Sequence, residues 1–334
     1  MMNSTSAATS HPDCSPVSRC VTRLISNLTR KVCNMSQYRP LRFLLAVGFA
    51  LVVAGCGNPE PISPGRYLET DQLVSRIDEN LAASATLSKI VDIDHSRLAQ
   101  EAGSFMPPAR VLIFSDAQLE ADLIQQNPLV ALDLPLRVLA FEAVSDGASK
   151  IIYNSFDYLL SRYHLDPGSS RALKARYIEN VDAAINGIEP EAIAAFSNDA
   201  MDPDGIITIT SPYGYEETIE RVTAAINAQS DTVHFGTVDF RANARELGID
   251  IAPAYMILFG APGPGGKAMA EAPTLGLDGF CQKFLIWEGA SGQIKLSFND
   301  LLALADRQGT KKALALRVIN YRLTKTFSDA LAIE

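Results

Sequence analysis

The sequence contains few of the residues that form disulfide bonds or bind metal ions. Its 334 residues include five cysteines and four histidines. Three of the cysteines lie within the first 55 residues, and no two histidines have the spacing of a metal site. This composition excludes a disulfide-stapled scaffold. We expect neither a metal ion nor another cofactor.

No complete catalytic motif is present either. The sequence has no Gly-x-Ser-x-Gly nucleophile elbow. The glycine-rich run APGPGGK, residues 261–267, lacks the Lys-Ser/Thr ending of a phosphate-binding loop, because Ala268 follows Lys267. We expect this run to form a flexible turn. The lack of a complete catalytic constellation favours a non-catalytic protein.

The N-terminal region has the pattern of an export signal. Arg39 and Arg42 precede an apolar run, residues 43–53, which is too short to span a bilayer comfortably. A charged start, a short apolar run and an exit of small residues are typical of a signal peptide. We therefore predict a signal peptide over residues 35–55. The alternative is a plain N-terminal membrane anchor.

The end of this region resembles the bacterial lipobox. Residues 53–56 read Val-Ala-Gly-Cys, and in a lipobox the cysteine is acylated and becomes the new N-terminus. The resemblance predicts lipidation of Cys56, and residues 1–34 as an extension from a misassigned start. Gly57 after the lipidated cysteine favours an outer-membrane address that faces the periplasm. The predicted location is thus the cell envelope, with the membrane as a partner through Cys56.

Removing the predicted leader makes the chain more acidic. Residues 1–55 hold six of the 29 Lys and Arg residues and one of the 38 Asp and Glu residues, so the formal net charge falls from −9 to −14. An acidic body gives no electrostatic reason to bind nucleic acid or anionic lipid headgroups. We expect no nucleic-acid partner. Cys281, which remains with Cys56, lies in an apolar strand and is interpreted as a packed thiol in preference to a nucleophile.

The chain repeats itself after a shift of 145 residues. The offset slips by one residue between Asp133 and Glu142 and then returns. A register kept for so long predicts a duplicated domain, and each copy is able to bury a core of its own. The identical pairs include Arg76 with Arg221, Asp94 with Asp239, Ala99 with Ala244, Pro108 with Pro253, Phe114 with Phe259, Asp133 with Asp278, and Asn154 with Asn299.

Each copy has the periodicities of an α+β domain. In copy one we predict helices over 71–84, 96–102 and 156–163, and strands over 87–93, 109–115, 134–142 and 149–154. In copy two we predict strands over 207–214, 232–240, 254–260, 283–289 and 292–300, and helices over 214–229, 242–248 and 301–309. The first strand of copy one, near 61–68, contains Pro64 and Gly65 and is expected to be an edge strand or lost.

These elements predict two domains and two further helical segments. The first domain covers 56–165 and the second 206–309, with a helical linker over 166–205 between them and a C-terminal helix over 310–334. Both segments contain apolar residues at helical spacing. They either pack across the copies and cover exposed sheet surface, or bind a partner.

Four polar residues recur at equivalent places in the two copies and are candidate ligand-binding residues. Asp133 and Asp278 each precede a buried strand, where an ionised carboxylate needs backbone amides or a cation. Capping the preceding turn is the role we favour for them over catalysis. Asn154 and Asn299 each stand before a helix, and we favour capping of the helix amides over ligand binding for them.

Asp94 and His95 are the neighbouring pair in copy one that is best suited to catalysis or ligand binding. A carboxylate beside an imidazole can tune a general base or orient a ligand. With Glu142 they are the candidate catalytic residues. The partner of the pair in copy two is Asp239-Phe240, so imidazole chemistry would exist in one copy only.

Together these segments resemble the family known as domain of unknown function 302. Its pattern is Asp-His, Pro-Pro, an apolar strand, Leu-Asp-Leu-Pro-Leu-Lys, Trp-Glu and Tyr-Asn. Copy one shows Asp94-His95, Pro107-Pro108, Leu132 to Leu136 with Arg137 for lysine, Phe141-Glu142 and Tyr153-Asn154. Copy two keeps Asp239, Pro253, Leu277-Asp278, Lys283, Trp287-Glu288 and Phe298-Asn299, and departs at Phe240 and at Gly279 to Cys281.

The resemblance implies a small α+β domain with an antiparallel sheet, like the saddle of the TATA-box-binding protein, that tends to pair into dimers. No reaction is established for the family. In a tandem chain the two copies would pair with each other as an internal pseudo-dimer. We interpret the protein as a lipid-anchored, non-catalytic binding or scaffold module for a small-molecule or protein ligand. The alternative is a small-molecule enzyme or sensor that uses Asp94 and His95.

Overall fold

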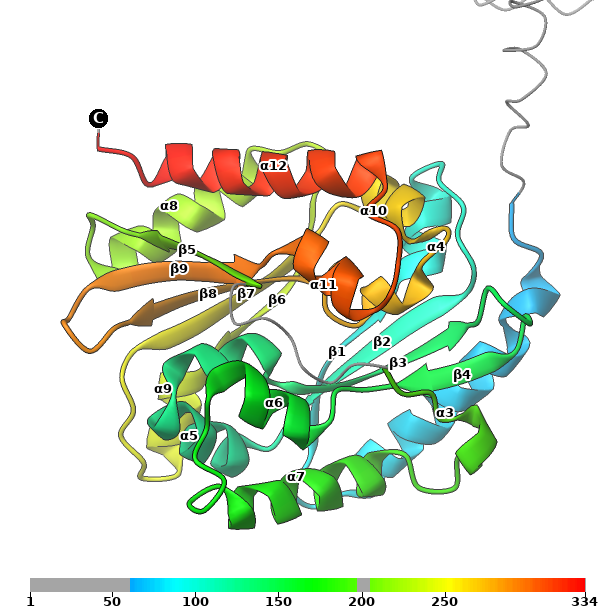
Figure 1. The fold of residues 1–334 in the computed structure, drawn as a ribbon, viewed down its shortest axis with the longest axis horizontal. Coiled ribbons are helices and arrows are strands. Elements are labelled where there is room, and N and C mark those ends of the chain that lie inside the picture. The colour runs from blue at the N-terminus through cyan, green and yellow to red at the C-terminus, as the bar shows by residue number, and fades with distance from the viewer. Residues whose placement is uncertain (1–60, 197–204, 334) are drawn as a thin grey trace, which may run out of the picture. The chain divides into compact units, whose positions relative to one another are not determined.

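The first sheet is antiparallel and has four strands in the order β1-β2-β3-β4 (Figure 1). The strands are β1 (Ser88–Asp94), β2 (Ala109–Ser115), β3 (Leu136–Glu142) and β4 (Ser149–Ile152). β3 is buried at every position, as expected of a short, almost wholly apolar run between two neighbouring strands.

The computed structural model describes residues 61–196 and 205–333. The predicted extension (1–34), the signal peptide (35–55), Cys56 and Gly57 lie outside the described residues. All the described residues belong to one compact unit, Pro59–Glu334.

The second sheet is also antiparallel and has five strands in the order β5-β9-β8-β7-β6. They are β5 (Ile206–Thr210), β6 (Val233–Asp239), β7 (Ala254–Gly260), β8 (Gln282–Glu288) and β9 (Ile294–Asn299). The segment of the first copy that corresponds to β5 forms a short 3₁₀ helix, η1 (Pro64–Tyr67), instead of a strand. Proline has no amide hydrogen for a ladder, so the expected edge strand is lost. The predicted α+β class with two antiparallel sheets is confirmed.

One long helix packs on each sheet. Helix α3 (Leu68–Ala83) contacts all four strands of the first sheet, and α8 (Tyr215–Asn227) contacts β8 of the second. The remaining elements of the first copy are α4 (His95–Glu101), α5 (Ala117–Gln126), η2 (Pro128–Asp133), α6 (Phe156–Tyr163), α7 (Arg171–Ala184) and η3 (Pro190–Ala192). Those of the second copy are α9 (Phe240–Glu246), α10 (Pro262–Met269), η4 (Pro273–Gly276), α11 (Leu301–Arg307) and α12 (Leu314–Ala330).

The run APGPGGK forms most of helix α10, so the predicted flexible turn is wrong. The physical reason is the packing of α10 against α4 of the first copy. A Cβ added to Gly266 would lie 2.5 Å from the Cβ of Ala99. The glycines therefore allow two helices to approach closely, and this tertiary contact outweighs the low helix propensity of glycine.

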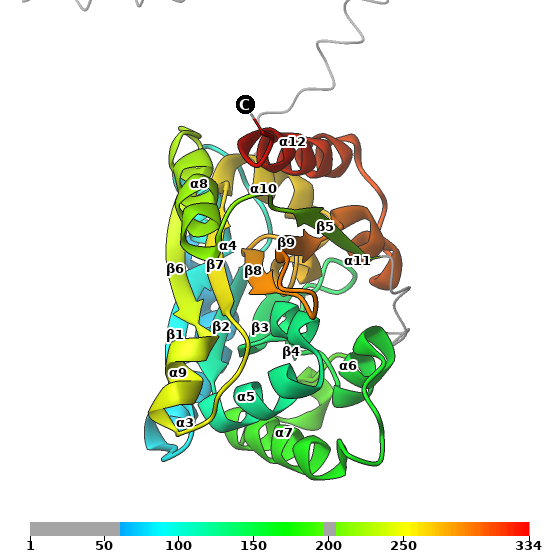
Figure 2. The same ribbon diagram turned by 90° about the vertical axis from the view of Figure 1, so that its left-hand side faces the viewer.

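The two copies pack with reciprocal contacts. Helix α4 contacts α10, and α5 contacts α9; η2 contacts β8, and η4 contacts β3. Because α4 corresponds to α9 and α5 to α10 in the repeat, each copy offers the other the same surface, as in an isologous dimer. The equivalent edge strands β1 and β6 lie side by side (Figure 2).

The two copies share one core. The buried apolar side chains of both sheets belong to a single continuous cluster, whereas the sequence led us to expect a separate core in each copy. The reason is that η2 packs on β7, β8 and β9 of the second copy and η4 packs on β2 and β3 of the first, and both carry buried residues such as Leu132 and Leu275.

The two additional helices each stay with one copy. Helix α7 contacts α3, α5 and α6 of the first copy, and α12 contacts α8, α10 and α11 of the second. Figure 1 shows them on opposite sides of the paired copies. Residues 197–204 of the predicted linker lie outside the described residues.

Candidate functional site

The two recurring aspartates meet at the junction of the copies. Asp133 ends η2 and Asp278 follows η4, and both carboxylates are fully buried. Arg137, from β3, joins them: its Nη2 donates to Oδ1 of Asp133 at 2.6 Å and also to Oδ1 of Asp278. Its Nε donates to the same Asp278 oxygen at 2.9 Å. The acids therefore bind cations, and the structure shows no turn-capping bond to either carboxylate among the described residues.

Three more cations surround these carboxylates. Nη1 of Arg162, from α6, donates to Oδ2 of Asp133 at 2.8 Å. Nζ of Lys283, from β8, donates to Oδ1 of Asp278 at 3.1 Å. Nη1 of Arg307, from α11, lies 3.7 Å from Oδ2 of Asp278. All these side chains are essentially inaccessible to solvent.

The two recurring asparagines exchange partners across the junction. Asn154 of the first copy accepts from Nη1 of Arg307 at 2.8 Å, and Asn299 of the second accepts from Nη2 of Arg162 at 2.7 Å. Nδ2 of Asn154 also donates to Oδ2 of Asp278 at 3.1 Å. The asparagine of each copy therefore accepts a hydrogen bond from the arginine of the other copy.

The predicted helix-capping role of the asparagines is wrong. Ser155 accepts from the amide of Tyr158 at the start of α6, and Asp300 accepts from the amide of Leu302 at the start of α11. In each copy the cap is one residue further along the chain than the asparagine. The asparagine side chain is therefore available for the junction.

We define the buried polar cluster as the eight residues that these bonds connect. They are Asp133, Arg137, Asn154, Arg162, Asp278, Lys283, Asn299 and Arg307. All four predicted ligand-binding residues lie in it. The two pairs of cations were not among the predicted site residues, although the same repeat aligns Arg162 with Arg307 and, after the one-residue slip, Arg137 with Lys283.

The cations keep the carboxylates of the cluster ionised. Burial acts to raise the pKa of Asp278, but Arg137, Lys283 and Arg307 outweigh it and hold that pKa well below the ordinary value. The pKa of Asp133 is also lowered, because Arg162 and Arg137 outweigh its burial. Burial, together with Arg137, lowers the pKa of Lys283 to about 8.

The three candidate catalytic residues have separate partners. Asp94 caps α4 by accepting from the amide of Arg97 at 2.9 Å. Nε2 of His95 lies 3.0 Å from the carbonyl oxygen of Gly276 in the second copy, and burial lowers the pKa of His95 to about 4. Glu142 accepts from Nε of Arg66 at 2.7 Å. The structure thus places a neutral imidazole in the junction, as a packed donor.

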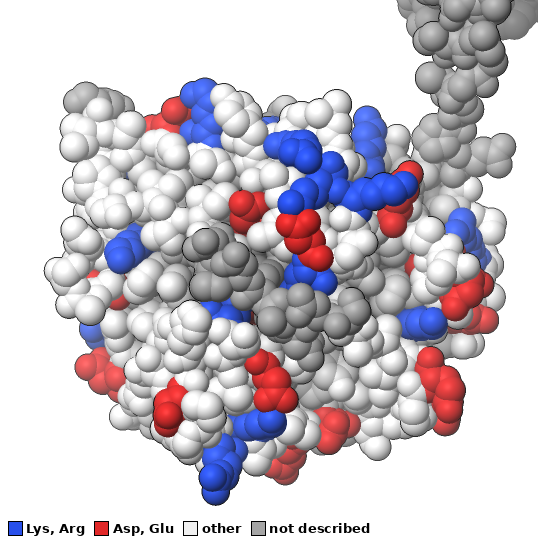
Figure 3. Space-filling model, in the orientation of Figure 1, with Lys and Arg blue, Asp and Glu red and all other residues white. Residues whose placement is uncertain are grey.

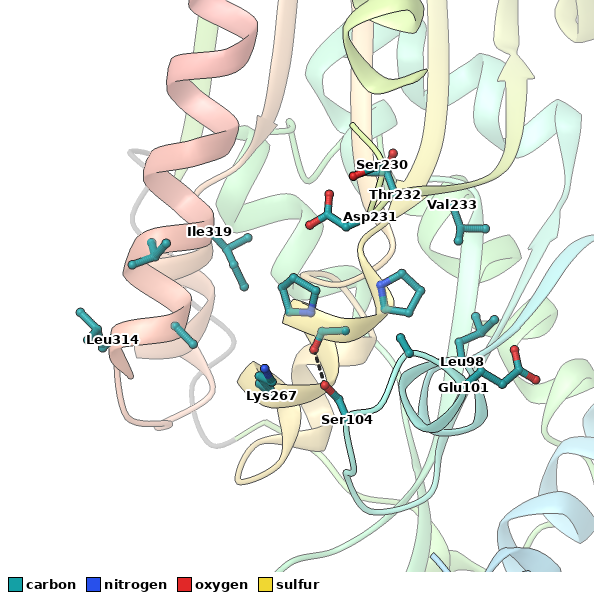
Figure 4. A pocket seen from close by; sticks show the side chains of 16 residues that line it. Leu98, Glu101, Ser104, Ser230, Asp231, Thr232, Val233, Lys267, Leu314 and Ile319 are labelled. Carbon is teal, nitrogen blue, oxygen red and sulfur yellow. Dashed lines mark hydrogen bonds between the residues drawn. The ribbon is translucent and has the colours of Figure 1, made fainter. Parts of the chain in front are cut away.

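A groove of about 870 Å³ opens beside α10, between α4 of the first copy and α12 of the second (Figure 4). Its walls are mostly apolar and include Leu98, Val233, Pro264, Leu314, Val318 and Ile319. Leu314 and Val318 are 76% and 56% exposed. Lys267 lies in the groove, as do Glu101 and Asp231, the latter paired with Arg322.

A comparison with protein families identifies the fold. The model of a family described as domain of unknown function DUF302 matches residues 65–188 and 207–327. The chain is a tandem DUF302 protein. The matched segments run through α7 and most of α12, so both helices fall within the family's own pattern.

Proteins similar to parts of the tandem DUF302 protein include two curated relatives and one solved structure. The chain is 39% identical over 103 residues to the fluoride-specific ion channel FluC 1 of Brucella suis and to that of Brucella abortus. The match covers 31% of this chain and 40% and 37% of those relatives, so the chain spans about two fifths of their length. A DUF302 protein from Bacillus stearothermophilus has a TM-score of 0.32 and 18% identity over 38% of this chain and 95% of that one.

Neither a membrane-spanning helix nor a group of metal ligands is found in the described part of the tandem DUF302 protein. In residues 61–196 and 205–333, no helix is long and apolar enough to cross a membrane. The same residues hold no group of three or more potential metal ligands. The two features of the described residues that could serve a function are the open, mostly apolar groove and the closed, charged junction between the copies.

Proposed function

We propose that this tandem DUF302 protein is a non-catalytic binding module held in the cell envelope by an acylated Cys56. The groove beside α10 supports the binding role, because its size is that of a ligand pocket and its walls are apolar. Soluble monomers rarely expose large contiguous apolar patches without a binding role. Both copies contribute to the groove, so the duplication itself creates the binding surface.

The ligand we propose is a small amphipathic molecule with an acidic group. The apolar walls would cover its body, and Lys267, an exposed cation at the groove, would pair with the acid. In the described residues no ion pair links Lys267 to a carboxylate of the chain. The alternative enzyme or sensor role receives less support, because His95 is buried and donates to a backbone carbonyl.

The binding role can be tested with 1-anilinonaphthalene-8-sulfonate, which combines an aromatic body with a sulfonate. We expect saturable binding to the full chain, measured by fluorescence. Val318→Asp places a charge in the groove and should weaken binding about tenfold, which corresponds to about 1.4 kcal/mol. Leu247→Asp is the matched control, because Leu247 is 48% exposed and lies away from the groove. Equal binding by both variants would contradict the proposal.

The proposed lipid anchor is inferred from the order of residues near the N-terminus. Arginines, a short apolar run and a cysteine after small residues favour export and acylation, and Gly57 favours the outer membrane. An acyl-modified cysteine carrying more than one chain holds a protein at a bilayer firmly. Cell fractionation tests this: Cys56→Ser should release the protein from membranes, and Cys281→Ser should not. A Cys56→Ser protein that stays with membranes would support the plain N-terminal anchor instead.

A further inference from the structure

The buried polar cluster contains more positive than negative charge. Arg137, Arg162, Lys283 and Arg307 are its cations, and Asp133 and Asp278 are its only carboxylates. The exposed fraction of each of these side chains is 3% or less. Among the described residues no other carboxylate lies within ion-pair distance of the cations. Burying uncompensated charge is unfavourable, and within the described residues the four cations have only these two carboxylates as counter-charges.

Arg307 has an unused hydrogen-bonding edge in this cluster. Its Nη1 donates to Oδ1 of Asn154, but neither Nε nor Nη2 has a hydrogen-bond partner in residues 61–196 and 205–333. The rings of Tyr158 and Phe196 lie 3.7 Å and 4.2 Å from the guanidinium carbon and cover it. The Nε–Nη2 edge presents two parallel donors in one plane, which is the arrangement that binds two oxygens of an anion.

Arg162, the counterpart of Arg307 in the repeat, is satisfied in a different way. Its Nη2 donates to Oδ1 of Asn299 and to the carbonyl oxygen of Gly205, and its Nη1 donates to Asp133 and to the hydroxyl of Tyr158. Within the described residues, its Nε is the one nitrogen of this side chain that lacks a partner. The pseudo-symmetry of the cluster is therefore broken at the edge of Arg307, and the two missing acceptors lie together there.

We propose that the Nε–Nη2 edge of Arg307 binds one small inorganic oxyanion. The anion accepts hydrogen bonds from Nε and Nη2 of Arg307 and supplies negative charge to compensate the four cations of the cluster. Both nitrogens are buried, so the site excludes large organic acids. This site is separate from the groove, and the inference goes beyond the proposed binding role.

Nitrate is the probe we choose, because it is small, planar and monovalent. Phosphate and sulfate stabilise folded proteins generally by exclusion from the surface, so a rise in Tm with them would not locate a site. We expect sodium nitrate to raise the Tm of the full chain saturably above that in sodium chloride at equal ionic strength. Isothermal titration should give one nitrate site per chain. Failure to find saturable nitrate binding would overturn the proposal whatever the variants do.

Two matched variants locate the site. Arg307→Lys keeps the charge but removes the paired donors, and it should weaken nitrate binding by about tenfold or more. Arg162→Lys alters the equivalent arginine and should leave nitrate binding within about twofold of the wild-type value. Circular dichroism confirms that each variant is folded. An equal nitrate response in wild type and Arg307→Lys, or its loss in both variants, overturns the assignment to Arg307.

Discussion

Asp278 shows how one residue can couple the two copies. It accepts hydrogen bonds from Arg137 and Asn154 of the first copy and from Lys283 of the second. Its lowered pKa means that the folded state favours the ionised carboxylate. This stabilisation is present above the ordinary carboxyl pKa and is lost as the pH falls through the lower pKa of the folded state.

Replacing this carboxylate should cost much of the stability of the fold. Asp278→Asn removes the charge that Arg137 and Lys283 share, so that Arg137 keeps only Asp133 and Lys283 loses the carboxylate it pairs with among the described residues. Removing one member of a buried ion pair typically costs about 3–5 kcal/mol. Chemical denaturation at pH 7.5 measures the change. Asp146→Asn, at a half-exposed surface pair, is the control and should leave stability nearly unchanged.

His95 should make the protein less stable in mild acid. Its folded pKa is about 4 and its ordinary value is 6.5, so between these values the unfolded state binds more protons and stability falls as the pH falls. Titration of His95 should contribute a loss of about 2–3 kcal/mol between pH 7.5 and pH 4.5, at 1.36 kcal/mol per pKa unit, whereas Glu120, whose burial raises its pKa to about 8, acts in the opposite sense. In His95→Phe, which copies Phe240 of the second domain, this loss should disappear. His234→Phe, at an exposed histidine, should keep it, and an unchanged pH profile in His95→Phe would refute the prediction.

At the scale of elements, close contact between helices decides what the glycine-rich run becomes. Helix α10 has no room for a side chain at Gly266, which faces Ala99 of α4. At Gly263 the nearest atoms to an added Cβ, those of Ala102, lie 3.6 Å away, which is ordinary contact. Two glycines in one short helix thus have different roles.

This difference predicts opposite effects of the same substitution. Gly266→Ala should force α10 away from α4 and destabilise the protein by about 1–3 kcal/mol, the usual cost of overpacking. Gly263→Ala should be neutral or stabilise by up to about 1 kcal/mol, because alanine favours the helix. Urea denaturation of the two variants gives both values. If Gly266→Ala is as stable as Gly263→Ala, the close contact does not matter energetically.

At the scale of the whole molecule, the two copies form one cooperative structure. A single apolar cluster runs through both sheets, and the buried polar cluster crosses between them. In an isolated copy the buried arginine would lack its asparagine partner, because that asparagine belongs to the other copy. We therefore expect both copies to unfold together.

Two tryptophan probes test this cooperativity. Trp287, the sole tryptophan of the chain, lies in β8 of the second copy, and Phe141 holds the corresponding place in β3 of the first. The wild type reports on copy two, and Phe141→Trp combined with Trp287→Phe reports on copy one. In each protein, fluorescence and far-ultraviolet circular dichroism should give the same urea midpoint. Midpoints that separate between fluorescence and circular dichroism would indicate independent domains.

Sequence patterns predicted a helix or strand accurately where its own residues determine its conformation. The strands predicted over 109–115 and 254–260 are β2 and β7 to the residue. Pro64 and Gly65 correctly marked the segment near 61–68 as a lost strand. Helix α10 was missed because its packing against α4, and not its own propensity, determines its conformation. The four ligand-binding candidates were recognised as polar positions, but two were assigned to helix caps that neighbouring residues provide.

Two copies of one α+β domain could be recognised without coordinates, because hydrophobic periodicity and a repeated register are properties of the chain alone. Figure 3 shows one face, on which acidic and basic side chains are interspersed and several basic ones gather in its upper part. Only the tertiary structure decided that Asp133 and Asp278 share Arg137, and that each asparagine serves the arginine of the other copy. Those partners lie more than a hundred residues apart along the chain, and only the packing of one copy on the other brings them within hydrogen-bonding distance.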